Sequence, residues 1–499
     1  MVRRIGCVLL VLCVLLLSGC DEVPDLTDDL IVGEGDTDTD TPQEALVFSL
    51  PYSHDDTLNP FSAATEVNLQ LARLLYDSLT VIGDGYMPQL SLAASVERPD
   101  PTHLVVTLRE GAVFSDGSDV TPDDVVKSFQ RAQTSVNYKT LLSNVTAAKA
   151  DKKKRQITFT LAAADIHADA CLTFPVVKAS TLTDKAAQAP VGGGLYTVQQ
   201  ADSSLKLVKN PHHPTMANYA EIALRHLPST AARYYALASG KLAYYFDDIS
   251  EGEEPRITGA SRPVELNAMV FLGINSAHEQ LALPEVRQAL SLLLDRTAVA
   301  AVYAERGKPS ASPLPTVWAP MAALSTIPSA AQDSDAAVAL LEQAGYPLTG
   351  KKMPELRLIY NSARDDRAAV AEQIRSQADA IGVKITLLPL SETEYRQALT
   401  DGEYELYLGE YRFGADMSLR SLLLGGDTSY GVAPDSAAAA AYTAYLSGEG
   451  TLQEFLDTFG TDVPFMPLCY RGGVAAYDRR LTSVTPTGYD PYHGIAAWY

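Results

Sequence analysis

The sequence of 499 residues is poor in cysteine and in positive charge. Its five cysteines are too few for a disulfide-dense scaffold. It carries 39 Lys and Arg against 61 Asp and Glu, for a net charge of −22. This balance argues against a nucleic-acid partner, because phosphate contacts need clustered basic side chains. The mean hydropathy of −0.02 excludes a polytopic membrane protein.

Motifs of catalysis and of metal binding are also missing. The sequence has no Gly-x-Ser-x-Gly, no His-Glu-x-x-His and no Cys-x-x-Cys. Gly345–Lys352 is close to a phosphate-binding loop, but Lys352 stands where Ser or Thr should bind magnesium. Prolines flank His212 and His213 and predict a surface turn, and the eight histidines show no ligand spacing. These absences argue against an enzyme, and we predict neither a catalytic residue, nor a metal site, nor a cofactor.

The N-terminus has the pattern of an export signal. Arg3 and Arg4 precede an apolar run from Ile5 to Leu17, which has signal-peptide length and is short for a membrane-spanning helix. The run ends in Leu-Ser-Gly-Cys20, which resembles the bacterial lipobox. That resemblance implies a signal peptide over residues 1–19 and a lipidated Cys20. It also implies an extracytoplasmic protein, lipid-anchored to the bacterial cell membrane.

Residues 20–44 are strongly acidic. Ten of residues 21–44 are Asp or Glu, and none is Lys or Arg. Such a segment cannot bury apolar area and its charges repel one another, so we predict a disordered tether. Metal binding by these carboxylates is the alternative, but no EF-hand spacing follows them.

The remaining cysteines allow two interpretations. Cys7 and Cys13 would leave with the signal peptide, and Cys20 would carry lipid, so Cys171 and Cys469 remain. They could form a disulfide or stay as two inert buried thiols, and we favour the thiols.

The first part of the body reads as strands with a capped helix. Apolar runs predict strands at 46–50 and 104–108, and a hairpin at 195–198 and 205–208. Thr121 is placed as an N-cap, followed by proline and two acidic residues, and this order predicts the start of a helix.

Past Glu265, strand and helix patterns alternate. Strands are predicted at 269–274, 356–360, 383–388, 404–408 and 465–470. Helices are predicted from Pro284, at 336–344, over the apolar face 370–381, from the capping box at Ser391, and at 452–459. The alternation predicts an α/β fold with a parallel sheet and right-handed crossovers.

Several blocks together resemble one family. Pro88–Ala94, Leu104–Gly117 and Thr121–Val125 are similar to the signature of the ABC-transporter extracellular solute-binding proteins of family 5, the peptide/nickel class. Further blocks follow in family order: Thr57–Pro60, Leu75–Leu79, Gly194–Val198, Val208–Pro211, Leu237–Leu242, Phe271–Asn275, Val286–Ser291, Leu340–Tyr346 and Ile381–Ile385. The resemblance covers nearly all of residues 46–499.

The resemblance implies a periplasmic-binding-protein-like fold of type II, with two lobes, a hinge and an interlobe cleft. Lobe I would comprise residues 45–268 together with 468–499, and lobe II residues 272–465. Crossovers near Asn275 and Cys469 would form the hinge. The ligand would bind in the cleft, and closure around it is the expected motion.

The resemblance also implies candidate ligand contacts. In peptide-binding members an aspartate of the second lobe holds the ligand α-ammonium, and Asp416 occupies that position; its alternative role is to cap a helix at 417–424. The cleft-lining segments also contain Tyr411 and Asn361. Arg364 or Arg412 could pair with a ligand carboxylate, unless both are ordinary surface arginines.

Two aromatic residues complete the candidate set. Tyr245 and Phe246 follow the Gly-Lys-Leu block and are placed as cleft walls, with burial in the core as the equal alternative.

The implied function is that of the membrane-tethered substrate-binding component of an ABC importer. It would capture short peptides as a monomer and deliver them to permease and ATPase subunits. The alternatives are the same fold binding nickel chelate, haem or oligosaccharide, and a cell-surface sensor or adhesin without transport. A cell-surface hydrolase is disfavoured by the missing motifs.

Overall fold

The computed structural model describes residues 46–183, 189–201, 204–249, 256–347, 353–426 and 428–499. Residues 46–499 form one compact unit. The predicted signal peptide, Cys20 and the acidic tether therefore lie outside the described residues. No helix in the described ranges is both long enough and apolar enough to cross a membrane.

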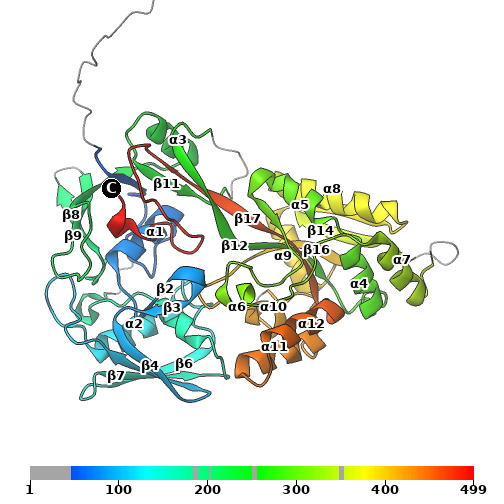
Figure 1. Cartoon of the computed structure of the whole chain (residues 1–499), viewed down its shortest axis with the longest axis horizontal. Coiled ribbons are helices and arrows are strands. Elements are labelled where there is room, and N and C mark those ends of the chain that lie inside the picture. The colour runs from blue at the N-terminus through cyan, green and yellow to red at the C-terminus, as the bar shows by residue number, and fades with distance from the viewer. Residues whose placement is uncertain (1–45, 184–188, 202–203, 250–255, 348–352, 427) are drawn as a thin grey trace, which may run out of the picture. The chain divides into compact units, whose positions relative to one another are not determined.

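Two four-stranded sheets and a small two-stranded sheet dominate the N-terminal half (Figure 1). The first has the order β1 (Ser49–Tyr52), β10 (Glu221–His226), β9 (Ser204–Lys209) and β8 (Tyr196–Ala201). The second has the order β4 (Ala93–Asp100), β5 (His103–Leu108), β7 (Gln156–Leu161) and β6 (Val145–Asp151). The third pairs β2 (Thr80–Ile82) with β3 (Pro88–Leu90). The predicted hairpin is confirmed as β8 and β9.

Two helices of this half have sequences that explain their start or their buried face. Helix α2 (Pro122–Thr134) begins at the predicted cap, where the side chains of Thr121 and Asp124 form a capping box. Helix α1 (Glu66–Leu75) buries one apolar face and leaves Arg73 outside that face. The short helix α3 (Thr230–Ala238) precedes β11.

The largest sheet is mixed. Its order is β11 (Tyr244–Asp247), β17 (Phe465–Tyr477), β12 (Ala260–Ile274), β16 (Leu406–Arg412), β14 (Leu356–Asn361) and β15 (Ile385–Leu390), with β13 (Gly307–Pro309) beside β17. Among the described strands of this sheet, only β14 with β15 and β14 with β16 are parallel pairs. The parallel pairing predicted for the β-α-β-α-β run is therefore confirmed for β14, β15 and β16, whereas the other strand pairs of this sheet are antiparallel. Strand β12 runs antiparallel to both of its neighbours, and several helices separate it in sequence from β14, so no single crossover helix fixes its direction.

The helices around this sheet include all five predicted helices, together with others that were not predicted. They are α4 (Pro284–Leu292), α5 (Arg296–Ala300), α6 (Ala319–Ala322), α7 (Ser334–Gln343), α8 (Asp365–Ala380), α9 (Glu392–Asp401), α10 (Arg420–Leu423), α11 (Ala437–Ser447) and α12 (Leu452–Asp462). The predicted capping box is confirmed at Ser391 and Glu394, before α9.

Strands β12 and β17 pass from one hydrophobic core into others. On β12, Leu266 and Ala268 belong to the N-terminal core, whereas Met269 and Phe271 belong to the next one. The pairing of β12 with β17 shifts register between Glu265 and Met269. Asn275, where one crossover is predicted, directly follows β12, and its side-chain amide donates to the carbonyl oxygens of Gly402 and Tyr404 in the loop before β16. On β17, Cys469 belongs to a third core, whereas Ala475 belongs to the N-terminal core, so this strand passes between cores after Cys469.

Both cysteines of the body are buried and free. Burial raises the pKa of each thiol, to about 12 for Cys469. The prediction of two inert thiols is confirmed, and the disulfide alternative is excluded.

Candidate ligand-binding site

The loop that follows β16 carries Asp416 and is firmly held. The backbone N–H of Phe413 donates to the carbonyl oxygen of Asn267 at 2.7 Å. The Tyr411 hydroxyl donates to the carbonyl oxygen of Ser418 at 2.8 Å. Met417 adopts a φ of +48°, in the left-handed region that non-glycine residues rarely occupy. These contacts hold the backbone on both sides of Asp416.

Asp416 is a half-buried carboxylate with little positive charge around it. Its Oδ2 accepts from the Cys171 thiol at 3.9 Å, and the nearby Arg420 is paired with Asp165 at 3.3 Å. Burial, and then the charge of Asp165, raise the pKa of Asp416 to about 7. In the described part of the chain, no ion pair within 4 Å includes Asp416.

The helix-capping alternative for Asp416 does not hold. Helix α10 begins at Arg420, and its N-cap is Leu419, whose side chain makes no capping hydrogen bond. The backbone N–H of Leu419 donates to the Tyr442 hydroxyl at 2.8 Å. Asp416 therefore lies three residues before the cap position.

Arg412 and Phe246 line a common cavity of about 390 Å³, together with Phe413. Small-molecule sites commonly have volumes of this order. Arg412 Nη2 is 2.5 Å from Asp248 Oδ2, so its charge already has a partner. The cavity is also bounded by α1, by the loop at 488–491 and by Asn267 of β12.

Tyr245 does not line this cavity. It belongs to a small apolar cluster with Val67 and Leu242, and its hydroxyl accepts from Arg233 at 3.1 Å. Of the two predicted aromatic walls, the structure thus places Phe246 at the cavity and Tyr245 in a core.

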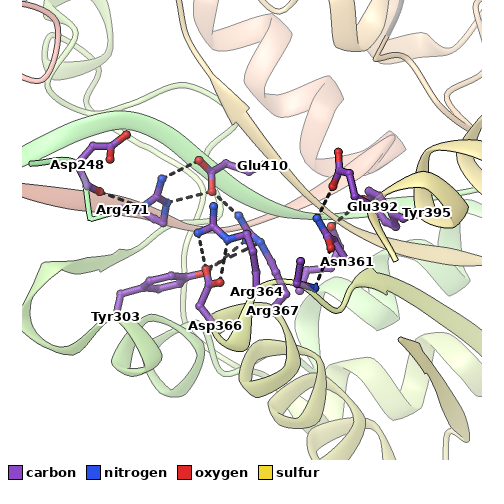
Figure 2. Close-up of polar contacts among 12 residues, drawn as sticks. Asp248, Tyr303, Asn361, Arg364, Asp366, Arg367, Glu392, Tyr395, Glu410 and Arg471 are labelled. Carbon is purple, nitrogen blue, oxygen red and sulfur yellow. Dashed lines mark hydrogen bonds and ion pairs between the residues drawn. The ribbon is translucent and has the colours of Figure 1, made fainter. Parts of the chain in front are cut away.

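Arg364 and Asn361 lie apart from the cavity, beside a buried ionic cluster (Figure 2). Arg364 donates to both carboxylate oxygens of Asp366, at 3.0 and 2.9 Å. The Asn361 amide donates to the Glu392 carboxylate, and its oxygen accepts from the backbone of Ala363. Both side chains are held by intramolecular partners.

The centre of the cluster in Figure 2 is Glu410 on β16. Arg471 of β17 donates to its two oxygens at 3.0 and 2.8 Å, and Arg367 of α8 is a second partner. Burial alone would raise the pKa of Glu410, but the two arginines outweigh burial and lower it. Arg471 also donates to the carbonyl oxygen of Asp248, which links the cluster to the partner of Arg412.

Two cavity residues, Arg73 and Asn267, were not among those predicted. The Asn267 side chain is 3% exposed, and neither its amide nitrogen nor its oxygen has a hydrogen-bond partner. The sequence does contain a signal for each. Arg73 interrupts the apolar run from Leu71 to Leu75, and Asn267 stands inside the otherwise apolar run 266–272.

The cavity and Asp416 are adjacent along two segments. Phe413 lines the cavity three residues before Asp416. Thr173 lines it two residues after Cys171, the residue that contacts Asp416. Asp416 itself does not line the cavity, and these two segments are what connects it to the cavity wall.

Comparison with known proteins identifies the family. The model of the bacterial extracellular solute-binding proteins, family 5, matches residues 87–426. The chain belongs to this family. The predicted family and the two-lobed α/β fold class of periplasmic-binding-protein type are confirmed. Family 5 consists of the solute-binding components of ABC transporters, which act outside the cytoplasm.

Individual relatives are distant and differ in ligand. Heme-binding protein A of Haemophilus influenzae is 23% identical over 336 residues, which is 59% of this chain and 60% of the relative. The match thus spans less than two thirds of that protein's length.

The solved structures support the fold. The murein tripeptide-binding protein MppA, in its unliganded open form, is 18% identical, has a TM-score of 0.74, and covers 91% of this chain and 98% of its own. NikA of Brucella suis, in complex with Fe(III)-EDTA, is 15% identical and has a TM-score of 0.70. The match covers 90% of this chain and 99% of NikA.

Proposed function

We propose that this chain is the membrane-tethered substrate-binding component of an ABC importer, and that it captures short peptides. It acts as a monomer without catalysis or a cofactor, and delivers its ligand to permease and ATPase subunits. Lobe I comprises residues 45–268 with 468–499, lobe II residues 272–465, and the ligand lies between them.

The observation that carries this proposal is Asp416. A carboxylate that is half-buried, beside a second acid and without an ion-pair partner in the described ranges, is matched to a cation brought by the ligand. The α-ammonium of a peptide supplies that cation with three N–H donors. MppA, of similar fold, is named for a tripeptide.

Nickel chelate, haem and oligosaccharide are the alternatives. Among the described residues no histidine lines the cavity, and the group of potential metal ligands found, His54 with Asp55 and His226, does not line it. The same part of the chain thus offers no imidazole to a metal in the cavity, which favours a peptide over a nickel chelate.

Mass spectrometry of the ligand retained by the purified protein tests this proposal. We expect peptides of a few residues with free N-termini. Retention of haem, of a metal chelate or of an oligosaccharide in their place would contradict peptide capture. Loss of peptide uptake on deletion of the gene would distinguish import from sensing.

The anchor is tested at Cys20. If Cys20 carries lipid, Cys20→Ala should abolish labelling by a fatty-acid analogue and release the protein from the membrane fraction. A membrane-bound, fully processed Cys20→Ala protein would contradict the lipid anchor.

A further inference from the structure

The cavity beside Asp416 is lined by two positive and two negative side chains. They are Arg73, Arg412, Glu66 and Asp490. Arg412 is paired with Asp248. Both carboxylates have donors: Glu66 Oε1 accepts from the Gln70 amide at 3.2 Å, and Asp490 Oδ1 from the backbone N–H of Tyr492 at 3.0 Å.

Arg73 differs from the other three. Its guanidinium carbon lies 4.0 Å from the centroid of the Tyr489 ring, which gives it a cation–π contact. Within the described ranges no carboxylate oxygen lies within 4 Å of it. The side chain is exposed and lines the cavity. Its guanidinium donates a hydrogen bond to Tyr489 and is attracted by Asp490, and these two residues raise the pKa of Arg73 against the effect of burial. A guanidinium has five N–H donors, so the others remain for a ligand in the cavity.

Asn267 is the second independent sign of a ligand. Its side chain is almost fully buried, and both polar atoms are unpartnered. Leaving a buried amide unpaired is destabilising, and native proteins rarely keep one without a reason. Asn267 opens on the same cavity as Arg73, so a ligand group there can bond to both.

We infer that this cavity binds one carboxylate of the ligand, which pairs with Arg73 and accepts a hydrogen bond from Asn267. A guanidinium matches a carboxylate by two parallel N–H···O bonds. The nearby Glu66 and Asp490 would repel a more highly charged anion such as phosphate, so a singly charged group fits best.

This inference rests on the proposed peptide function and makes it more specific. With the ammonium at Asp416 and the carboxylate at Arg73, the ligand is a zwitterion with two free ends. The carboxylate comes from the peptide C-terminus or from an acidic side chain, and these two sources can be separated.

The test uses the full-length protein, freed of retained ligand, and native mass spectrometry. The probes are four tripeptide mixtures: with free ends, with amidated C-termini, with acetylated N-termini, and amidated with one internal Glu. The first three lack Asp and Glu. Wild type, Arg73→Gln, Asp416→Asn and the exposed control Arg225→Gln are compared.

We expect amidation to weaken binding to wild type and Arg225→Gln by about 30-fold or more, the cost of losing one partner of a desolvated pair. Arg73→Gln should bind free and amidated mixtures equally, yet still reject acetylated peptides. Binding recovered by the internal Glu would assign the carboxylate to a side chain, and no recovery would assign it to the C-terminus.

The outcomes separate the two claims. If wild type rejects acetylated peptides but binds amidated ones as well as free ones, the carboxylate site is wrong and the ammonium site stands. If it rejects amidated but accepts acetylated peptides, the ammonium site is wrong and the carboxylate site stands. Capture of no peptide overturns both.

Asn267→Leu gives a second readout that does not depend on Arg73. Replacing an unpaired buried amide by an apolar side chain of similar size should raise the thermal midpoint of the ligand-free protein while weakening its binding of free-ended peptides. A lower midpoint with unchanged peptide binding would show that Asn267 has only a structural role, and would contradict its part in the site.

Discussion

Asp416 makes the stability of the protein depend on pH. Its pKa is raised to about 7 from an ordinary value of 3.8, chiefly by burial. Between these two values the folded state therefore binds more protons than the unfolded state. The folded state is therefore favoured at acid pH, and the free energy of unfolding falls as the pH rises from about 4 to 7.

We predict that Asp416→Asn removes this pH dependence. Between pH 5 and pH 8, ligand-free wild type should lose at most about 3 kcal/mol of unfolding free energy relative to Asp416→Asn. Urea denaturation at the two pH values measures the difference. If the unfolding free energies of the two proteins change equally between the two pH values, the surroundings of Asp416 do not raise its pKa.

The ionised carboxylate is the form that binds an ammonium. We therefore predict that peptide affinity rises as the pH increases from 5 through 7 and levels off near pH 8, because Asp416 loses its proton over that range. Calorimetry with one free-ended peptide checks this. Affinity that does not change over this range would contradict the assignment.

At the scale of elements, the buried cluster on β16 joins strands that are distant in sequence. Glu410 bonds to Arg471 of β17 and to Arg367 of α8, and both arginines are almost fully buried. Removing one partner of such a cluster leaves buried charge without compensation.

We predict that Glu410→Gln destabilises the protein by about 3–5 kcal/mol, because two buried guanidinium groups lose their carboxylate. Its matched control is Glu372→Gln on α8, an exposed residue paired with Arg375, where no measurable change is expected. Chemical denaturation of both variants is the measurement. Equal stabilities would show that the cluster is not needed for folding.

The sequence could predict the starts of helices better than the extent of long strands. The caps at Thr121 and Ser391 were predicted correctly because a capping box needs only residues three apart. The extension of β12 back to Ala260 was not, because it depends on pairing with β17, more than 200 residues away.

The site was predictable only in part, for a related reason. Arg412 and Asp248 are 164 residues apart, so no local pattern shows that they pair. Arg364 has a partner only two residues away, at Asp366, but its burial beside Glu410 depends on the whole sheet. The family resemblance identified the Asp416 loop, whereas Arg73 and Asn267 needed the fold.

At the scale of the whole molecule, several contacts connect the segment at 164–171 with helices α10 and α11. The backbone N–H of Ile166 donates to the carbonyl oxygen of Leu446 at 2.9 Å, and His167 Nε2 lies 2.6 Å from the Tyr445 hydroxyl. In the proposed division these contacts join the two lobes beside Asp416. They would break when the lobes open.

We predict that the lobes close on the ligand. Small-angle scattering should give a smaller radius of gyration with a saturating free-ended peptide than without it, because two strands alone connect the proposed lobes. An unchanged scattering profile, with binding confirmed by calorimetry on the same sample, would contradict a closing cleft.

The measurement that tests the central claim most directly is a calorimetric cycle between Asp416 and the peptide N-terminus. If Asp416 holds the ammonium, then Asp416→Ala and N-terminal acetylation should each weaken binding by about 2–5 kcal/mol. Acetylation should then cost little more in Asp416→Ala, because the interaction has already been lost. Losses that simply add would contradict the account, since Asp416 and the ammonium would then act independently.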